Sequence, residues 1–252
     1  MRILSIDSSL GTQLAVVDAT PSAAGARALQ VLSQDEQADT RRHAESLGQM
    51  LSRALSAPEA AERPLDAVVA ATGPAPFTGL RAGLVTAGVV GRTRGVPVHG
   101  VSSLDAVARR ALDELGAHEG REDPVVLVAT DARRREVYTA LFRANGPDDV
   151  TRLTEIIVCP PAQVAQRLAE QVPGPGGGSG GIDVVAGSGA SLYPELAEMA
   201  SYQKALAPVS GDALAQVRIA LARLERGEEL STQPLYLRHA DVQMPAARKR
   251  VR

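Results

Sequence analysis

Aromatic residues are scarce in this chain, at 2% of its 252 residues, and tryptophan is absent. Few rings are therefore available to stack on exposed nucleobases, and the core has to be packed with Ala, Val and Leu. The single cysteine, Cys159, excludes an internal disulfide and a multi-cysteine metal site. A formal net charge of -2 gives no overall attraction to nucleic acid or anionic lipid.

Long apolar runs are also missing from the sequence. No segment approaches the ~18 uninterrupted apolar residues that read as a membrane helix. The N-terminal stretch MRILSIDSSLGTQLAVVD has too short an apolar run, and no small-residue cleavage site, for a signal peptide. With 44% hydrophobic and 22% charged residues, the composition is that of an ordinary globular protein, and we expect it in the cytoplasm without membrane contact.

What is present is a repeated order of strands and helices. Apolar runs at 2–7 and 12–18 predict an opening β-hairpin. Further strands are predicted at 28–34, 66–72, 95–101, 124–142 (two strands joined by a turn), 152–158 and 182–190, and helices at 41–57, 102–115 (with a Ser-x-x-Asp cap), 161–171 and 210–227. Because the hairpin-led order starts again near residue 124, we expect two related α/β lobes. Their predicted bounds are 1–105 and 106–227, followed by a C-terminal segment, 228–252.

Two stretches stand outside this order. The glycine-rich run VPGPGGGSGG, residues 172–181, predicts a flexible surface loop. The end of the chain, AARKRVR, predicts a solvated basic tail, and a phosphate contact with tRNA in an assembled complex is the alternative.

The stretch ATGPAPFTGLRAGLVTAGVVG, residues 70–91, places a glycine- and proline-rich bend directly before a helix. It is not a P-loop, since Thr78 stands where the second glycine is due, and it is not a dinucleotide fingerprint. Pro74 and Pro76 also remove two backbone N–H donors that a phosphate would use. These features weigh against a phosphate cradle and leave a bend that precedes a packed helix.

Small residues recur every four positions along that helix, at Gly79, Gly83, Ala87 and Gly91. Each helical glycine costs ~1 kcal/mol relative to alanine, so something has to offset the loss. Close backbone approach along this ridge is the natural compensation. With Leu80, Leu84 and Val85 beside it, the ridge suits either the chain's own sheet or a partner's helix.

Six segments, taken in order, carry a family resemblance: ILSIDSS (3–9), HAESL (43–47), GPAPFTGLRAGL (73–84), VSSLDAVA (101–108), VATDARRREVYTALF (128–142) and PLYLR (234–238). Together they resemble TsaB, the non-catalytic subunit of the bacterial tRNA threonylcarbamoyladenosine machinery, from residue 2 to about 238. In the family a Gly-Ser pair usually stands where this chain has Ala75 and Pro76. The bend is therefore expected to be stiffer and to lack a hydrogen bond from that serine.

The resemblance implies an ASKHA-type fold, the two-lobed α/β architecture of actin-like ATPases that is related to ribonuclease H. It also implies binding to a TsaD-type transferase that modifies adenosine 37 of tRNA, with a TsaE-type ATPase in the complex and tRNA reached only through it. The same surface is expected to form a homodimer when TsaD is absent. It falls on the helices at about 43–56 and 78–93, with the expected interface residues His43, Glu45, Leu47, Met50, Leu51, Ala54, Phe77, Leu80, Arg81, Gly83, Leu84 and Ala87.

The titratable residues lack the pattern of an active relative. None of the histidines, His43, His99, His118 and His239, has the four-residue spacing of the transferase's metal ligands, so no metal is expected. Asp7 and Asp131 end strands where ASKHA kinases hold magnesium and phosphate, but both could instead cap hairpin turns. We expect no catalytic residue and no firmly bound cofactor, and ATP or ADP at the interface of a complex stays open.

Weak nucleotide contacts are predicted at Asp7, Ser8, Ser9, Gly187 and Gly189. The alternative function is accordingly an autonomous ASKHA-type, nucleotide-dependent phosphotransferase. A glycopeptidase-like enzyme is a further alternative, but Gly187-Ser188-Gly189 lacks the spacing of a nucleophile elbow. The sequence favours a non-catalytic scaffold that activates a transferase.

Overall fold

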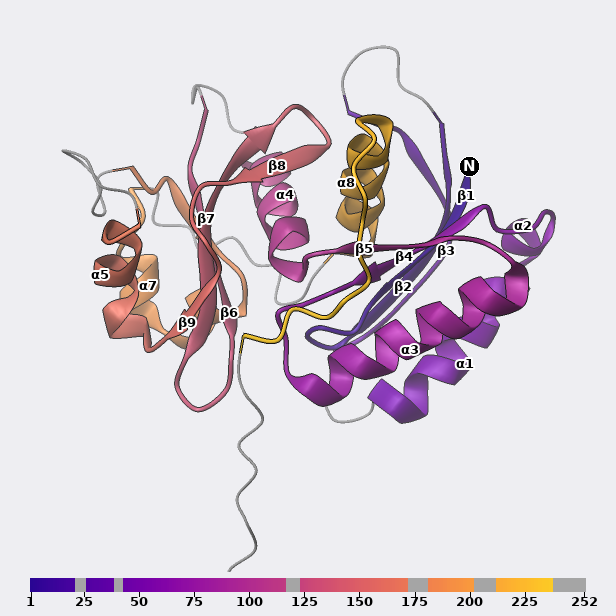
Figure 1. Cartoon of the computed structure of the whole chain (residues 1–252), viewed down its shortest axis with the longest axis horizontal. Helices are drawn as coiled ribbons and strands as arrows, with labels where there is room; N and C mark the ends of the chain where they lie inside the picture. Colours follow the sequence, from indigo (N-terminus) through magenta and orange to yellow (C-terminus); the bar gives the residue numbers. More distant parts are fainter. Residues whose placement is uncertain (21–25, 39–42, 117–122, 172–180, 202–211, 238–252) are drawn as a thin grey trace, which may run out of the picture.

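The computed structural model describes residues 1–20, 26–38, 43–116, 123–171, 181–201 and 212–237, and of residues 43–45 only the backbone. The chain forms two sheets, each with helices on both faces, and the two lobes lie side by side (Figure 1). This is the predicted ASKHA-type α/β architecture. Within the described ranges, no helix is both long and apolar enough to cross a membrane.

The first lobe is built on a five-stranded sheet with the order β3-β2-β1-β4-β5. Strands β1 (Arg2–Asp7), β2 (Thr12–Ala19) and β3 (Leu29–Gln37) pair antiparallel, which confirms the opening hairpin. Strands β4 (Ala67–Ala71) and β5 (Val98–Val101) continue the sheet in parallel on the other side of β1. All six residues of β1 are buried, as expected of a central strand covered on both faces.

Helices α1 (His43–Ser56) and α3 (Phe77–Arg94) lie side by side across one face of this sheet, with the short helix α2 (Pro58–Ala61) following α1 (Figure 1). Leu47 and Met50 of α1 enter the same apolar cluster as the sheet residues. Glycine at the end of α3 fits the helix stop, because Gly95 adopts the left-handed conformation of a C-cap.

The opposite face of the same sheet is covered by α8 (Ala213–Glu225), from the far end of the chain. Its residues Val217 and Ile219 are fully buried and belong to one apolar cluster with Ile3 and Val69 of the sheet. The segment 106–227, expected as the C-terminal lobe, therefore contains a helix that completes the first lobe. The helical periodicity at 210–227 predicts the helix correctly but carries no information about which sheet it covers.

The second lobe has a sheet with the order β10-β6-β7-β8, and β9 also pairs with β7. Its strands are β6 (Val126–Asp131), β7 (Val137–Asn145), β8 (Asp149–Arg152), β9 (Ile157–Cys159) and β10 (Val184–Ala186). The single strand predicted at 152–158 is thus two short strands. Between them the hydroxyl of Thr154 accepts a hydrogen bond from the Leu141 N–H, so a side chain replaces a backbone partner of β7.

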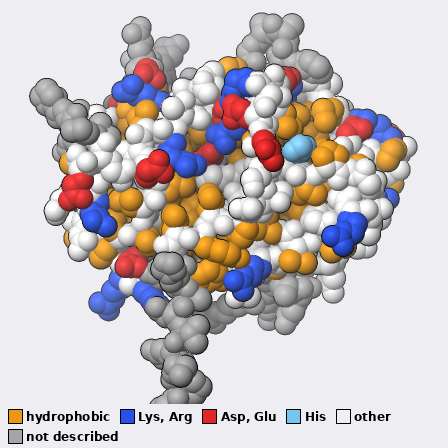
Figure 2. All heavy atoms as spheres, viewed as in Figure 1, with side chains coloured by type: hydrophobic (Ala, Val, Ile, Leu, Met, Phe, Trp, Pro, Cys, Tyr) orange, Lys and Arg blue, Asp and Glu red, His pale blue; other side chains and the backbone are white. Residues whose placement is uncertain are grey.

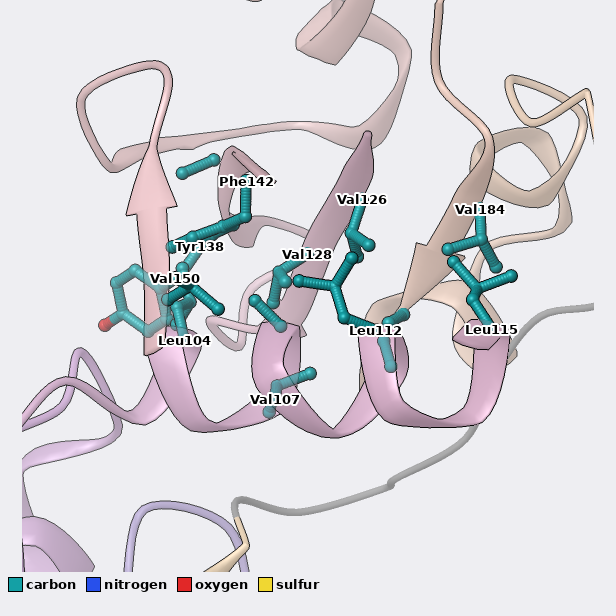
Figure 3. Packing of buried hydrophobic residues seen from close by; sticks show 14 of the residues in the cluster. Leu104, Val107, Leu112, Leu115, Val126, Val128, Tyr138, Phe142, Val150 and Val184 are labelled. Carbon is teal, nitrogen blue, oxygen red and sulfur yellow. The ribbon is translucent and has the colours of Figure 1, made fainter. Parts of the chain in front are cut away.

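Helix α4 (Ser103–Gly116) packs on one face of the second sheet, where its leucines and Val107 meet Val126, Phe142 and Val184 (Figure 3). The other face carries four short helical segments: η1 (Pro161–Gln163), α5 (Val164–Ala169), α6 (Ser188–Leu192) and α7 (Pro194–Ala197). Helices α4 and α8 also contact each other, so they join the two lobes.

The cap predicted for α4 is not formed. The hydroxyls of Ser102 and Ser103 are buried without a hydrogen-bond partner among the described residues. The carboxylate of Asp105 instead forms ion pairs with Arg152 at 2.9 Å and Arg223 at 2.8 Å. Asp105 therefore forms long-range ion pairs instead of the helix cap that the local Ser-x-x-Asp pattern predicts.

Residues 228–237, which we call the C-terminal strap, run from the end of α8 back across the first lobe (Figure 1). The strap is held by two backbone hydrogen bonds, Gly100 N–H to the Leu230 carbonyl at 3.2 Å and Leu235 N–H to the Thr72 carbonyl at 2.8 Å. It ends beside the start of α3. The predicted loop up to residue 180, the basic tail from Arg238 onward, His118 and His239 lie outside the described residues.

Candidate functional site

The small-residue ridge of α3 faces the chain's own sheet. A Cβ added at Gly83 would lie 2.2 Å from Ser8 Oγ, and one at Gly91 would lie 2.3 Å from a methyl group of Val98. The Ser8 hydroxyl also donates to the Gly79 carbonyl at 2.8 Å. The glycines thus allow the helix to approach β1 and β5 closely, and the expectation that Gly83 and Ala87 contact a partner is corrected.

Four further residues expected at the interface are core residues. Leu47, Met50, Ala54 and Leu80 are at most 3% exposed and pack beneath α1 and α3. Leu51, Leu84 and Phe77 are half-buried, and Arg81 is exposed. The side chains of His43 and Glu45 lie outside the described part of the chain. Most of the expected interface residues whose side chains are described therefore lie on the inner faces of α1 and α3, against the chain's own sheet.

The outer face of α3 carries two exposed valines. Val85 is 65% exposed and Val89 is 56% exposed, and Gly88 between them has open space around it. Exposed large apolar side chains in neighbouring positions mark interaction surfaces more often than isolated ones do. Sequence analysis missed Val89, although a helical projection opposite the glycine ridge would have placed it beside Val85.

An aromatic cluster adjoins this face at the start of α3. The rings of Phe77 and Tyr236 have centroids 4.9 Å apart, and the Arg81 guanidinium lies 5.4 Å from each centroid. Arg81 Nε also donates to the Tyr236 hydroxyl at 2.9 Å. The C-terminal strap thereby fixes the first turn of α3, a role for Tyr236 that no local pattern around residue 236 indicates.

The carboxylate of Asp7 is buried at the end of β1. It accepts hydrogen bonds from the Ser9 N–H at 2.8 Å and from the Gln216 side chain of α8 at 2.7 Å. Burial raises the pKa of Asp7 above its ordinary value, and these hydrogen bonds oppose the shift only in part. Gln216 is held in turn by the Ser5 hydroxyl at 3.3 Å. Both oxygens of Asp7 are therefore occupied by groups of the protein itself.

Asp131 ends β6 in the corresponding way. Its carboxylate accepts from the Arg133 N–H at 2.8 Å, and its own N–H donates to the Ser188 hydroxyl at 2.9 Å. Each strand-end aspartate thus bonds the amide two residues further on, which confirms that both cap their hairpin turns. Arg133, Arg134 and Arg135 all have positive φ, between 56° and 63°, so this turn is unlike a glycine-based phosphate turn.

The two glycines predicted for nucleotide contact lie against β6. A Cβ at Gly187 or Gly189 would come within 2.5 Å and 2.8 Å, respectively, of the Ala129 carbonyl oxygen. Their small size lets the start of α6 pack on the strand. Between the two hairpin turns lies a cavity of about 10 Å³, lined in part by Ser9, Pro74 and Asp131. The cavity is small, and residues of both lobes line it.

Ion pairs bridge the lobes on the side of α8. Asp149, 1% exposed, lies 2.9 Å from Arg223 and also pairs with Arg226. Asp148, next to it, pairs with Arg218 of α8 at 2.8 Å. Because the two aspartates belong to the β7–β8 hairpin, the second sheet is tied to a helix of the first lobe. Among the described residues no cluster of histidine, cysteine and carboxylate side chains could hold a metal ion.

A protein-family profile described as "TsaD: tRNA N6-adenosine threonylcarbamoyltransferase" matches residues 30–179, more than half of the chain. The chain belongs to this family. The profile match and the fold together confirm the resemblance to TsaB-like proteins predicted from the sequence.

Sequence relatives occur in mycobacteria. The uncharacterized proteins Mb3455c of Mycobacterium bovis and Rv3421c of Mycobacterium tuberculosis are each 40% identical over 146 residues, which cover 55% of this chain and 64% of theirs. The uncharacterized protein ML0378 of Mycobacterium leprae is 41% identical over 136 residues, 54% of this chain and 33% of its own length. The match thus spans less than two thirds of these relatives.

Solved structures agree on the fold over nearly the whole chain. YeaZ from Pseudomonas aeruginosa superposes with a TM-score of 0.71 at 23% identity, covering 94% of this chain and 99% of that one. An uncharacterized protein with similarity to peptidase YEAZ, from the same organism, gives a TM-score of 0.69 at 24% identity over the same shares. The chain therefore shares its fold with these two proteins although the sequences have diverged.

Proposed function

We propose that this chain is a non-catalytic, TsaB-like subunit that binds a TsaD-type transferase and supports threonylcarbamoylation of tRNA adenosine 37. The observation that carries the proposal is the outer face of α3, where Val85 and Val89 are exposed in the middle of a helix whose opposite face packs on the first sheet. A helix held rigidly from behind by its glycine ridge is a pre-organised docking element, which lowers the entropic cost of association.

A non-catalytic role is supported by the region between the hairpin turns. Both oxygens of the Asp7 carboxylate already accept hydrogen bonds, one from the Ser9 amide and the other from the Gln216 side chain. A phosphotransferase would require Asp7 to release Gln216 and the lobes to separate. The ion pairs of Asp148 and Asp149 with α8 oppose such a separation.

The other members of the proposed assembly follow from the family. A TsaE-type ATPase joins through the complex, tRNA is reached through the transferase, and nucleotide, if bound, lies at the shared interface. In this proposal the chain supplies a surface rather than a reacting group. Two helices per partner are enough for an interface of standard size, ~1,600 Å² in total.

The deciding experiment is co-purification with the TsaD-type transferase encoded in the same genome, followed by a threonylcarbamoylation assay with and without this chain. We expect Val85→Asp to abolish co-purification and stimulation. The matched control is Leu192→Asp, which places the same charge on an exposed apolar residue of the second lobe, 55% exposed. Stimulation that survives Val85→Asp, or ATP hydrolysis by the isolated chain that Asp7→Asn abolishes, would overturn the proposal.

A further inference from the structure

We propose that the tip of the hairpin between β6 and β7 contacts the phosphate backbone of tRNA while the assembled complex modifies it. The tip consists of Arg133, Arg134 and Arg135, three consecutive arginines that are all exposed. The inference rests on the proposed function for the identity of the nucleic acid, but it concerns a different surface, on the second lobe. In Figure 2 blue side chains project at the lower left, where Figure 1 shows the turn between β6 and β7.

The backbone of this tip has a conformation that arginine seldom adopts. The φ angles of the three residues are 63°, 56° and 60°, in the left-handed region. There the Cβ of an L residue crowds the backbone, so glycine or asparagine is the usual occupant, and as a single residue. Three successive arginines therefore strain the turn. Backbone strain of this kind clusters at binding sites, and the side chain retained here in spite of it is a guanidinium.

Hydrogen bonds on both sides hold the turn in this conformation. The Ala132 N–H donates to the Glu136 carbonyl at 2.9 Å, and the Glu136 N–H donates to the Arg133 carbonyl at 3.1 Å. The Asp131 carboxylate accepts from the Arg133 N–H at 2.8 Å and lies 3.3 Å from the Arg133 guanidinium. Because these N–H groups are used within the turn, it offers side chains rather than amides to a ligand. A fixed base for those side chains lowers the entropy lost on binding.

The chemistry of the tip fits a phosphodiester. A guanidinium is planar and always charged, and it can donate two parallel hydrogen bonds to one phosphate. Contacts to the phosphate backbone need no stacking platform, which suits a chain with only 2% aromatic residues. The tip is therefore expected to bind RNA without reading its sequence.

The contribution of the tip is local. The whole chain carries a formal net charge of -2, so it exerts no long-range attraction on RNA. Exposed charges are also screened over a Debye length of ~8 Å at physiological ionic strength. The contact therefore acts where a transferase already holds the tRNA, and it orients the nucleic acid rather than capturing it.

The test compares tRNA binding by two complexes of the same-genome transferase, one with the wild-type chain and one with Arg134→Asn/Arg135→Gly. Arg133 is kept because its ion pair with Asp131 anchors the turn. Asparagine and glycine tolerate the left-handed region, so the variant removes two charges without adding strain. We expect tRNA affinity to fall about ten-fold, a difference of ~1.4 kcal/mol. The slope of log affinity against log salt concentration should fall by ~1.4–1.8, since each phosphate contact contributes ~0.7–0.9.

Thermal unfolding and two further variants distinguish a binding role from a structural one. Relief of strain should leave the Tm of Arg134→Asn/Arg135→Gly unchanged or higher, and a lower Tm together with lost binding would assign the arginines a structural role instead. Arg134→Lys/Arg135→Lys keeps both charges and should keep most of the salt slope. The matched control, Arg143→Asn/Arg167→Asn, removes two exposed arginines elsewhere on the second lobe and should leave tRNA affinity unchanged. Equal losses in the control and the tip variant would overturn the inference.

The outcomes also separate this inference from the proposed function. If both complexes form and bind tRNA equally well, the inference fails and the proposed function stands. If the chain does not bind the transferase, tRNA binding is measured on the isolated chain at low salt. Binding that is lost in the tip variant then supports the inference while the proposed function fails, and binding that is absent or unchanged refutes both. Tip-dependent binding to phosphatidylserine vesicles, without tip-dependent binding to tRNA, would assign the arginines to a lipid surface and also refute the inference.

Discussion

Replacing Gly83 with alanine tests the inward packing of α3 directly. The added Cβ would lie 2.2 Å from the Ser8 hydroxyl oxygen, a distance that cannot persist. Ser8 is 2% exposed, so its hydroxyl has little room to turn and would lose its 2.8 Å hydrogen bond to the Gly79 carbonyl. The loss leaves the buried Ser8 hydroxyl without this partner and removes one of the hydrogen bonds of the Gly79 carbonyl, at a cost of about 1–3 kcal/mol.

A gain in helix propensity opposes this cost. Alanine is better than glycine inside a helix by ~1 kcal/mol, so the net expected destabilisation is about 0–2 kcal/mol. For a chain of this size, each kcal/mol lowers Tm by roughly 2–4 °C. Gly88→Ala is the matched control, since a Cβ there has open space around it, and it should instead be neutral or stabilising by up to ~1 kcal/mol.

Urea unfolding of the two single variants, and of Gly83→Ala in a Ser8→Ala background, measures the effect. Without the hydroxyl, the nearest atom to the new methyl group is the Cβ of residue 8 at 3.1 Å, so the second substitution should restore much of the stability. If Gly83→Ala is as stable as Gly88→Ala, the ridge does not pack on β1, and the assignment of α3's inner and outer faces is refuted.

Three other substitutions test the cleft, the lobe junction and the strap. Burial raises the folded-state pKa of Asp7, so the protonated carboxyl stabilises the fold below its ordinary pKa of 3.8, and this contribution is lost as pH rises. Asp7→Asn does not titrate, but its amide replaces one of the two oxygens that accept from Ser9 and Gln216. We therefore expect the Tm of Asp7→Asn relative to wild type to increase from low pH to pH 7, and equal Tm differences at the two pH values would contradict this. Asp149→Asn removes the charge of a side chain that is 1% exposed and faces two arginines, so it should lower the free energy of unfolding by about 3–5 kcal/mol. Asp35→Asn, which breaks an exposed ion pair, is the control and should lower it by at most ~1 kcal/mol; thermal unfolding measures both. Gly100→Ala would place a Cβ 2.1 Å from the Ser231 carbonyl oxygen, so it should displace the strap and speed proteolysis there; an unchanged digestion pattern would show that the strap tolerates the methyl group.

Local chemistry made much of the fold predictable. The opening hairpin, the helices before and after β4, and the strand-end turns at Asp7 and Asp131 depend on residues within a few positions of one another. The sequence does not decide whether the small-residue ridge of α3 faces the chain's own sheet or another protein. A four-residue ridge of small side chains predicts close packing, but its spacing is the same whether a sheet or another protein lies against it.

Long-range partners account for the remaining differences. Gln216 and Asp7 are separated by 209 positions, so no local pattern indicates that an α8 amide fills the place beside the first strand. The same holds for Tyr236 and Arg81, which lie 155 positions apart. For the exposed valines of α3, the signal is present in the sequence, because both lie opposite the glycine ridge on a helical projection, but it predicts exposure only once the ridge is known to face inward.

The position of α8 has a consequence for the growing chain on the ribosome. The strands of the first sheet are complete by Val101, yet the helix that covers one face begins at Ala213, about 110 residues later. At 5–20 residues per second, synthesis of that stretch takes roughly 5–20 s. During this interval Ile3, Val17 and Val69 have no native cover, so the half-made lobe should be a substrate for chaperones that recognise apolar strands.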